Sequence, residues 1–146
     1  YKRDDILVTL AGPASNLASA SVALILLVII KHITAGGLAA VATAVALASN
    51  IKGIPTVGLP ALFPVALFLY FVVLINLLLF IFNLIPIPPL DGSHILRHFL
   101  PYRALQLYDR MGMIGLIVLF LIGGSFIFTV FFDPLLRTFN HLLFTL

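Results

Sequence analysis

The sequence predicts an all-α integral membrane protein, and two observations carry that prediction. Of 146 residues, 62% are apolar and 9% are charged, whereas a soluble domain carries roughly a quarter charged residues. The charges are also clustered, so that residues 6–30, 53–90 and 111–132 hold none. Each gap is long enough for a helix that crosses a bilayer, which takes about 20 apolar residues. These features exclude a soluble enzyme, a nucleic-acid-binding domain and a disordered tail.

The first transmembrane helix is expected at residues 6–30. It is not a signal peptide, because the apolar stretch is too long and contains Asn16. Its first half is rich in alanine, glycine and serine, and small residues let helix backbones approach closely inside lipid. Pro13 is expected to bend or open this helix near its start, because proline has no N–H to donate to the preceding turn.

Residues 32–51 lie between Lys31 and Lys52 and contain few large apolar side chains. Their strongly apolar part, residues 38–47, is too short to cross a bilayer. We therefore favour a half-buried segment over a fourth crossing, and the crossing stays open as an alternative.

The other two transmembrane helices are expected at residues 62–84 and 111–132. Between them, three prolines break the helix, and residues 94–110 follow as a predicted amphipathic helix at the membrane surface. Residues 134–146 are expected to form an apolar tail that is too short to span.

Asn76 and Asn83 lie seven residues apart, on one face of the helix expected at 62–84. A buried asparagine in a membrane helix usually hydrogen-bonds a neighbouring helix, and this is the interpretation favoured for Asn76. It is weaker for Asn83, which lies one turn before the prolines.

The absence of cysteine and of glutamate limits the chemistry of the chain. There is no cysteine, which excludes disulfides, thiolate catalysis and cysteine-based zinc sites. All five acidic residues are aspartates, so a mechanism that needs a glutamate base must take it from outside this chain. The first residue is Tyr1 rather than methionine, and we expect the chain to be a fragment or a processed product.

Asp91 is the principal candidate for chemistry. It follows a long apolar stretch on backbone that Pro86, Pro88 and Pro89 prevent from being helical. Ionisable groups at membrane depth are costly, and irregular backbone is tolerated there where it lines a wet cavity. Asp91 is therefore expected beside a polar cavity. The alternative is that Asp91 or Ser93 caps the helix that begins at this point, and the spacing does not decide between the two.

His94 and His98 are four residues apart, a spacing that suits two zinc ligands on one helix face, with Asp91 nearby. A helix-borne zinc protease motif would have glutamate directly after the first histidine, where this chain has Ile95. The favoured interpretation is therefore that both histidines face the headgroup region on a surface helix.

Two motifs resemble those of a known family. The run from Asn83 to Gly92 fits the pattern N-x-x-P-x-x-x-x-D-G, with Pro86 and Asp91 at the other fixed positions. It resembles the second signature of the site-2 proteases, a family of intramembrane zinc metalloproteases. The run Gly12-Pro13-Ala14-Ser15-Asn16 is similar to the glycine–proline–asparagine helix that precedes this signature in the family.

The resemblance implies a zinc ion held by two histidines of an H-E-x-x-H helix and by an aspartate, here Asp91. It implies that Asn83 lies near the scissile carbonyl as a donor to the developing oxyanion or to the substrate backbone. It also implies a set of supporting residues around the site: Asn16, Gly12, Pro13, Pro86 and Gly92.

This chain departs from the family pattern because it has no H-E-x-x-H, a motif that precedes the glycine–proline helix in the family. We expect residues 1–146 to form a single transmembrane domain that is the C-terminal part of a larger protease core. The implied function is cleavage of membrane-spanning substrate helices, in the cell membrane of a prokaryote, with Zn²⁺ as cofactor. The expected partners are a membrane-embedded protein substrate and the lipid bilayer, and no nucleic acid.

Two other functions stay open at this point. Broken helices with polar groups at membrane depth also occur in transporters, although no second broken segment mirrors the first. A non-catalytic relative of the proteases would bind membrane partners without cutting them. The residues upstream of Tyr1 would discriminate among the three hypotheses.

Overall fold

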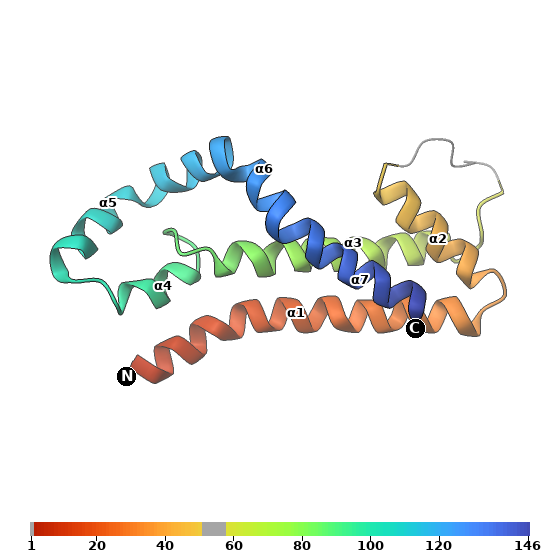
Figure 1. Ribbon diagram of the computed structural model, residues 1–146. Helices are drawn as coiled ribbons and strands as arrows, with labels where there is room; N and C mark the ends of the chain where they lie inside the picture. The colour runs from red at the N-terminus through yellow and green to blue at the C-terminus, as the bar shows by residue number, and fades with distance from the viewer. Residues whose placement is uncertain (1, 51–57) are drawn as a thin grey trace. The chain divides into compact units, whose positions relative to one another are not determined.

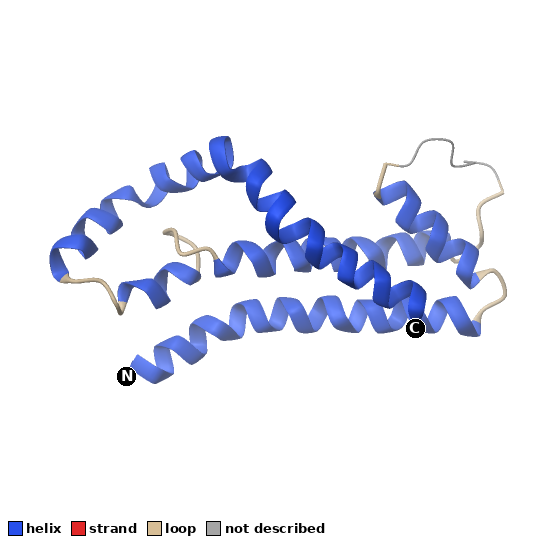
Figure 2. Cartoon of the chain, viewed as in Figure 1, coloured by secondary structure: helices blue, strands red, loops and turns tan. Residues whose placement is uncertain are grey.

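The computed structural model describes residues 2–50 and 58–146, and this part of the chain is helical without any strand (Figures 1 and 2). The helices, in order, are α1 (Lys2–Ile33), α2 (Gly37–Ala48), α3 (Phe63–Leu84), α4 (Gly92–Arg97), α5 (Tyr102–Val118), α6 (Gly124–Ile127) and α7 (Asp133–Thr145). Two π-helical turns, Leu119–Gly123 and Phe128–Phe132, join α5 to α6 and α6 to α7. The all-α prediction is confirmed for the described residues.

Among the described residues, three helical stretches are long and apolar enough to cross a membrane: Asp4–Ile33, Phe63–Leu84 and Gly112–Thr145. They fall where the uncharged gaps of the sequence predict them. The segment expected to be half-buried contains α2, whose 12 residues span about 18 Å at 1.5 Å per residue. This is less than the ~30 Å hydrocarbon core, so α2 is too short to cross. Residues 51–57 of the connection that follows lie outside the described part.

The surface helix expected at 94–110 is wrong in one respect, because the structure has two helices there. α4 ends at Arg97, and α5 begins at Tyr102 after an extended Pro101 with φ −68° and ψ 155°. Pro101 has no N–H to donate to the Arg97 carbonyl four residues earlier, so the first helix cannot continue through it.

The third span also differs from its predicted bounds. The sequence analysis separates residues 111–132 from a short tail, whereas the structure continues the helix to Thr145, which gives a stretch of 34 residues. Pro134 does not stop it, because this proline lies in the first turn of α7, where a missing N–H is tolerated.

The described residues divide into two compact units. One comprises residues 2–17 and 77–135, and the other comprises residues 18–76, as far as they are described, and 136–146. The division passes through α1 and α3 and so marks no linker. The expectation of a single transmembrane domain stays a prediction.

The second unit has a core of closely packed apolar side chains. Leu27, Tyr70, Val73 and Leu143 are at most 1% exposed. The Tyr70 hydroxyl donates a hydrogen bond of 3.0 Å to Oδ1 of Asn140, which satisfies the one polar atom of that side chain. The core of this unit is therefore apolar, and the hydroxyl of its buried Tyr70 is hydrogen-bonded.

A polar contact joins the C-terminal ends of α1 and α7 in this unit. Lys31 Nζ, in the last turn of α1, donates to the Leu143 carbonyl at 2.9 Å, where a cation stabilises the free carbonyls that end α7.

Asn76 Nδ2, in the middle of α3, donates to the Val72 carbonyl at 2.8 Å, within its own helix. The prediction that Asn76 bonds a neighbouring helix is therefore wrong, because its own preceding turn offers a nearer acceptor.

The α1–α2 turn depends on a glycine pair. Gly36 has φ 79°, a conformation that glycine adopts without steric cost. Gly37 is buried, and a Cβ at this position would collide with the Ile30 carbonyl and with Oγ1 of Thr34.

We predict that Gly37→Ala lowers the free energy of unfolding by about 1–3 kcal/mol, because the colliding group is backbone and cannot rotate away. Gly124→Ala is the control, since a Cβ there meets no atom within 4 Å in the described structure, and it should shift stability by at most about 1 kcal/mol. Denaturant unfolding in detergent measures both. Equal effects of the two substitutions would contradict the packing described for the turn.

Candidate functional site

The segment between α3 and α4 has an irregular backbone because three of its residues are prolines. Pro86, Pro88 and Pro89 have no N–H, so the carbonyls four residues before them lose their helical partners. Single turns replace the helix, including a bond of 2.9 Å from the Leu90 N–H to the Ile87 carbonyl.

Gly92 closes the base of this segment. A Cβ on Gly92 would lie 2.7 Å from the carbonyl oxygens of both Leu84 and Ile85, so α4 begins in direct backbone contact with the end of α3. A larger residue at this position would push the two helix ends apart.

Asp91 stands directly before α4 but does not cap it. Its backbone is helical (φ −57°, ψ −39°), and its side chain makes no capping hydrogen bond. Ser93, the other capping candidate, is the second residue of α4 and only 2% exposed. The capping interpretation of Asp91 is therefore not supported. Within the described part of the chain, the half-buried Asp91 carboxylate has neither a hydrogen bond nor an ion pair.

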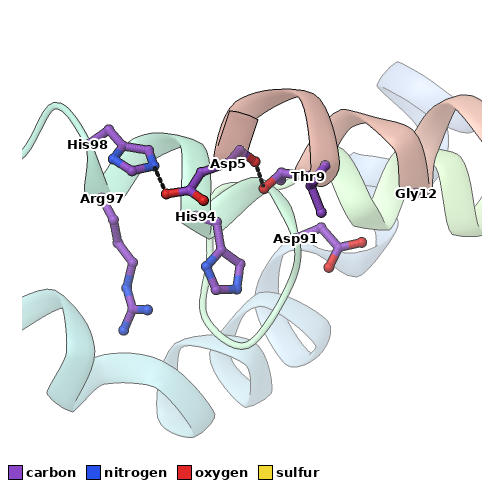
Figure 3. A pocket seen from close by; sticks show the side chains of 8 residues that line it. Asp5, Thr9, Gly12, Asp91, His94, Arg97 and His98 are labelled. Atoms are coloured by element: carbon purple, nitrogen blue, oxygen red, sulfur yellow. Dashed lines mark hydrogen bonds and ion pairs between the residues drawn. The ribbon is translucent and has the colours of Figure 1, made fainter. Parts of the chain in front are cut away.

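The carboxylate faces a cavity of about 510 Å³ within the first unit. Figure 3 shows the residues that line it. α1 contributes Asp5, Val8, Thr9 and Gly12, α4 contributes His94 and Arg97, and the residues directly before and after α4 are Asp91 and His98.

Gly12 gives the carboxylate its room. A Cβ on Gly12 would lie 2.8 Å from Oδ2 of Asp91, closer than ordinary contact, so the carboxylate rests against the backbone of α1. The next residue, Pro13, is buried and has no N–H to donate to the Thr9 carbonyl. α1 nevertheless stays helical through Pro13, so the helix does not open there, and the bend stays a prediction.

Two of the basic side chains that line the cavity lie beside other carboxylates than Asp91. Nε of Arg97 donates to Oδ1 of Asp109 on α5 at 3.0 Å, and Nε2 of His98 lies 3.9 Å from Oδ2 of Asp5. Figure 3 shows the Arg97 side chain directed away from the Asp91 carboxylate. Asp91 is thus left without an ion pair among the described residues, although Arg97 and two histidines line the same cavity.

The remaining predicted site residues do not line this cavity. The side chains of Asn83, near the end of α3, and Asn16 are half-buried, and no hydrogen bond of either amide occurs in the part of the molecule that the structure describes. Pro86 accepts a hydrogen bond of 2.7 Å at its carbonyl from the Tyr108 hydroxyl. The structure therefore brings Gly12 and Asp91 together and leaves the roles of Asn16, Asn83 and Pro86 as predictions.

Sequence reasoning named Gly12 but missed the other α1 residues of the cavity, which are Asp5, Val8 and Thr9. Asp5, Val8, Thr9 and Gly12 follow the spacing i, i+3, i+4, i+7, which places them on one helix face. This signal was present in the sequence and could have indicated the face that meets Asp91.

The donor set bears on the implied metal. Among residues whose side chains are described, no group of three His, Asp, Glu or Cys is placed to hold a metal ion, so a complete zinc site built on His94 and His98 does not form. Asp91 by itself suits one position in a metal site, because it offers a half-buried, unpaired carboxylate beside a glycine that leaves space. The described part of the chain places no pair of further ligands beside it.

Together the fold and the site define a helical protein with three helices able to cross a membrane and an unpaired carboxylate on broken backbone at the end of one of them. The model of Peptidase family M50 matches residues 2–123. The chain therefore belongs to this family, the site-2 proteases.

A curated relative supports the same assignment. Over 126 residues the chain is 35% identical to a protein of Bacillus subtilis (strain 168) named "Putative zinc metalloprotease YwhC". The alignment covers 84% of this chain and 48% of the relative, so the chain spans about half the length of the curated relative that it matches. No solved structure matches the chain.

Proposed function

We propose that this chain is the C-terminal part of an intramembrane zinc metalloprotease of the site-2 type, in which Asp91 is a zinc ligand. The substrate would be a membrane-spanning helix of another protein, and the location the cell membrane of a prokaryote. One observation carries the proposal: the Asp91 carboxylate is half-buried and has no partner in the described chain, although Arg97 is close enough to line the same cavity.

The electrostatics favour a cation at this carboxylate. A charged group taken out of water is costly unless it is paired or bound to a metal. Asp109, in the same unit, meets this requirement through Arg97. Asp91 has no such partner, and a bound metal cation would compensate its charge.

The residues of this chain would do three things in that site. Asp91 would hold the metal, and Gly12 would keep the space that the carboxylate needs. The amide of Asn83, which has no partner among the described residues, is free to donate to the substrate. Zinc, when bound, supplies a Lewis acid and lowers the pKa of a coordinated water. The histidine ligands and a glutamate base would be provided outside residues 1–146.

Family membership disfavours the transporter hypothesis. Experiment must distinguish a protease from a non-catalytic relative that binds membrane partners. Such a relative could keep the fold and the Asp91 carboxylate while lacking cleavage activity.

We predict that Asp91→Ala in the complete protein weakens zinc binding by at least about 100-fold, since it removes a ligand rather than an outer-shell partner. Cleavage of a membrane-embedded substrate should be lost as well. Zinc content after dialysis and a cleavage assay measure the two effects.

The matched control is Asp133→Ala, the same change at a carboxylate that does not line the cavity. It should retain both zinc and cleavage. Full zinc binding by the Asp91 variant would remove Asp91 as a ligand, and zinc binding without cleavage in the wild type would indicate the non-catalytic relative.

A second prediction concerns Gly12. Gly12→Ala places a methyl group against Oδ2 of Asp91, and a misplacement of about 1 Å in a catalytic site can cost on the order of 100-fold in rate. We expect cleavage to fall by about 10- to 100-fold. Unfolding should shift by no more than about 1 kcal/mol, because alanine favours the helix more than glycine.

The comparison is Gly124→Ala, also in a helix but with open space around the new methyl group. It should leave cleavage unchanged. Unaltered cleavage by Gly12→Ala would show that the position of the Asp91 carboxylate relative to α1 is not important for activity.

A further inference from the structure

Helix α5 contacts the irregular segment that carries Asp91 along one face. The Tyr108 hydroxyl donates to the Pro86 carbonyl at 2.7 Å. A Cβ on Gly112 would lie 3.5 Å from Cβ of Pro88, and a Cβ on Gly115 would lie 3.4 Å from Cγ2 of Ile87. Residues 108, 112 and 115 have the spacing i, i+4, i+7 and share a helix face. The two glycines let this face lie close to the segment, and the tyrosine bonds to it.

The segment needs such support because its own hydrogen bonding is poor. Its three prolines donate no backbone hydrogen bond, and the carbonyls that would have accepted those bonds are freed. In the described part of the chain, Tyr108 provides the only side-chain hydrogen bond to the backbone of residues 85–91. Pro86 is thus held from outside the segment, five residues before Asp91.

We propose that Tyr108 is the positioning residue for Asp91, acting through the backbone of the irregular segment and not by contact with the metal or the substrate. This inference rests on the proposed function of Asp91 as a metal ligand. The hydroxyl fixes the Pro86 carbonyl, and the face formed with Gly112 and Gly115 limits the movement of Ile87 and Pro88. Outer-shell partners of this kind change metal affinity by about 10- to 100-fold.

The phenol keeps its proton under ordinary assay conditions. Burial raises the pKa of Tyr108 above its ordinary value, and the Arg97 charge and the Ser93 side chain act in the opposite direction without reversing the shift. Tyr108 therefore stays a hydrogen-bond donor at neutral pH.

The test uses the complete protein with Tyr108→Phe, which removes the hydroxyl and keeps the ring. Tyr102→Phe is the matched control. It is the same substitution on the same helix, and its exposed hydroxyl accepts a bond from Nε2 of Gln106 without touching the irregular segment.

Four quantities are compared: amide hydrogen exchange of residues 85–93, the zinc Kd, kcat with KM, and the unfolding midpoint. For Tyr108→Phe we expect exchange about 10-fold faster in this segment and a zinc Kd about 10-fold weaker. We also expect a lower kcat at unchanged KM, because the substrate is not contacted. The control should match the wild type in all four.

Three results would overturn the inference. Exchange and zinc affinity equal to those of the control would show that the hydroxyl does not position the segment. Faster exchange or a lower midpoint with unaltered zinc affinity and kcat would show a purely structural role. A wild-type protein that binds no zinc would overturn the proposed function itself and the inference with it, and this result is distinguishable because it appears before any substitution is made.

Discussion

The loss of backbone hydrogen bonding at Pro86, Pro88 and Pro89 is the constraint on which the site depends. These prolines end α3 at Leu84 and leave a stretch of chain that cannot be helical at the end of an apolar span. Helices otherwise satisfy their own polar backbone groups within a bilayer. The break therefore needs compensation, which comes from single turns, from the contact of Gly92 with the end of α3, and from α5.

The broken backbone also places a carboxylate where a regular helix would not. Asp91 lies against α1 at Gly12, in a cavity where Arg97 is paired with Asp109 and His98 lies near Asp5. Because Arg97 is held by Asp109, Asp91 keeps its charge available. This unpaired carboxylate is the basis of the proposal that Asp91 is a metal ligand, which agrees with membership of Peptidase family M50. The proposed metal-binding role of Asp91 is inferred from its unpaired carboxylate and not from any one sequence motif alone.

Much of the fold could be predicted because charge is so costly inside lipid. Uncharged gaps of known length located the three spans found among the described residues, and the length of residues 38–47 favoured a half-buried segment over a fourth crossing. The errors have local causes. Pro101 divides the helix predicted at residues 94–110, and the tail predicted at residues 134–146 instead continues the preceding helix, because Pro134 lies in the first turn of α7.

The site was less accessible from the sequence than the fold. The spacing around Asp91 left a capping role and a functional role equally open, and only the geometry shows that the carboxylate makes no capping bond. The contact between Gly12 and Asp91 joins residues 79 positions apart, and no periodic pattern in one sequence pairs them. The same holds for Tyr108 and Pro86. Their hydrogen bond joins a helix to an irregular segment 22 residues earlier in the chain, and local sequence spacing does not predict such a bond.

Zinc K-edge X-ray absorption of the complete protein with Asp91→Cys tests the central claim most directly. This chain has no cysteine, so a sulfur ligand that is absent from the wild-type spectrum must come from position 91. The account predicts a zinc–sulfur distance of about 2.3 Å in this variant and none in Asp109→Cys. A zinc-loaded Asp91→Cys protein whose zinc shell contains no added sulfur would contradict it.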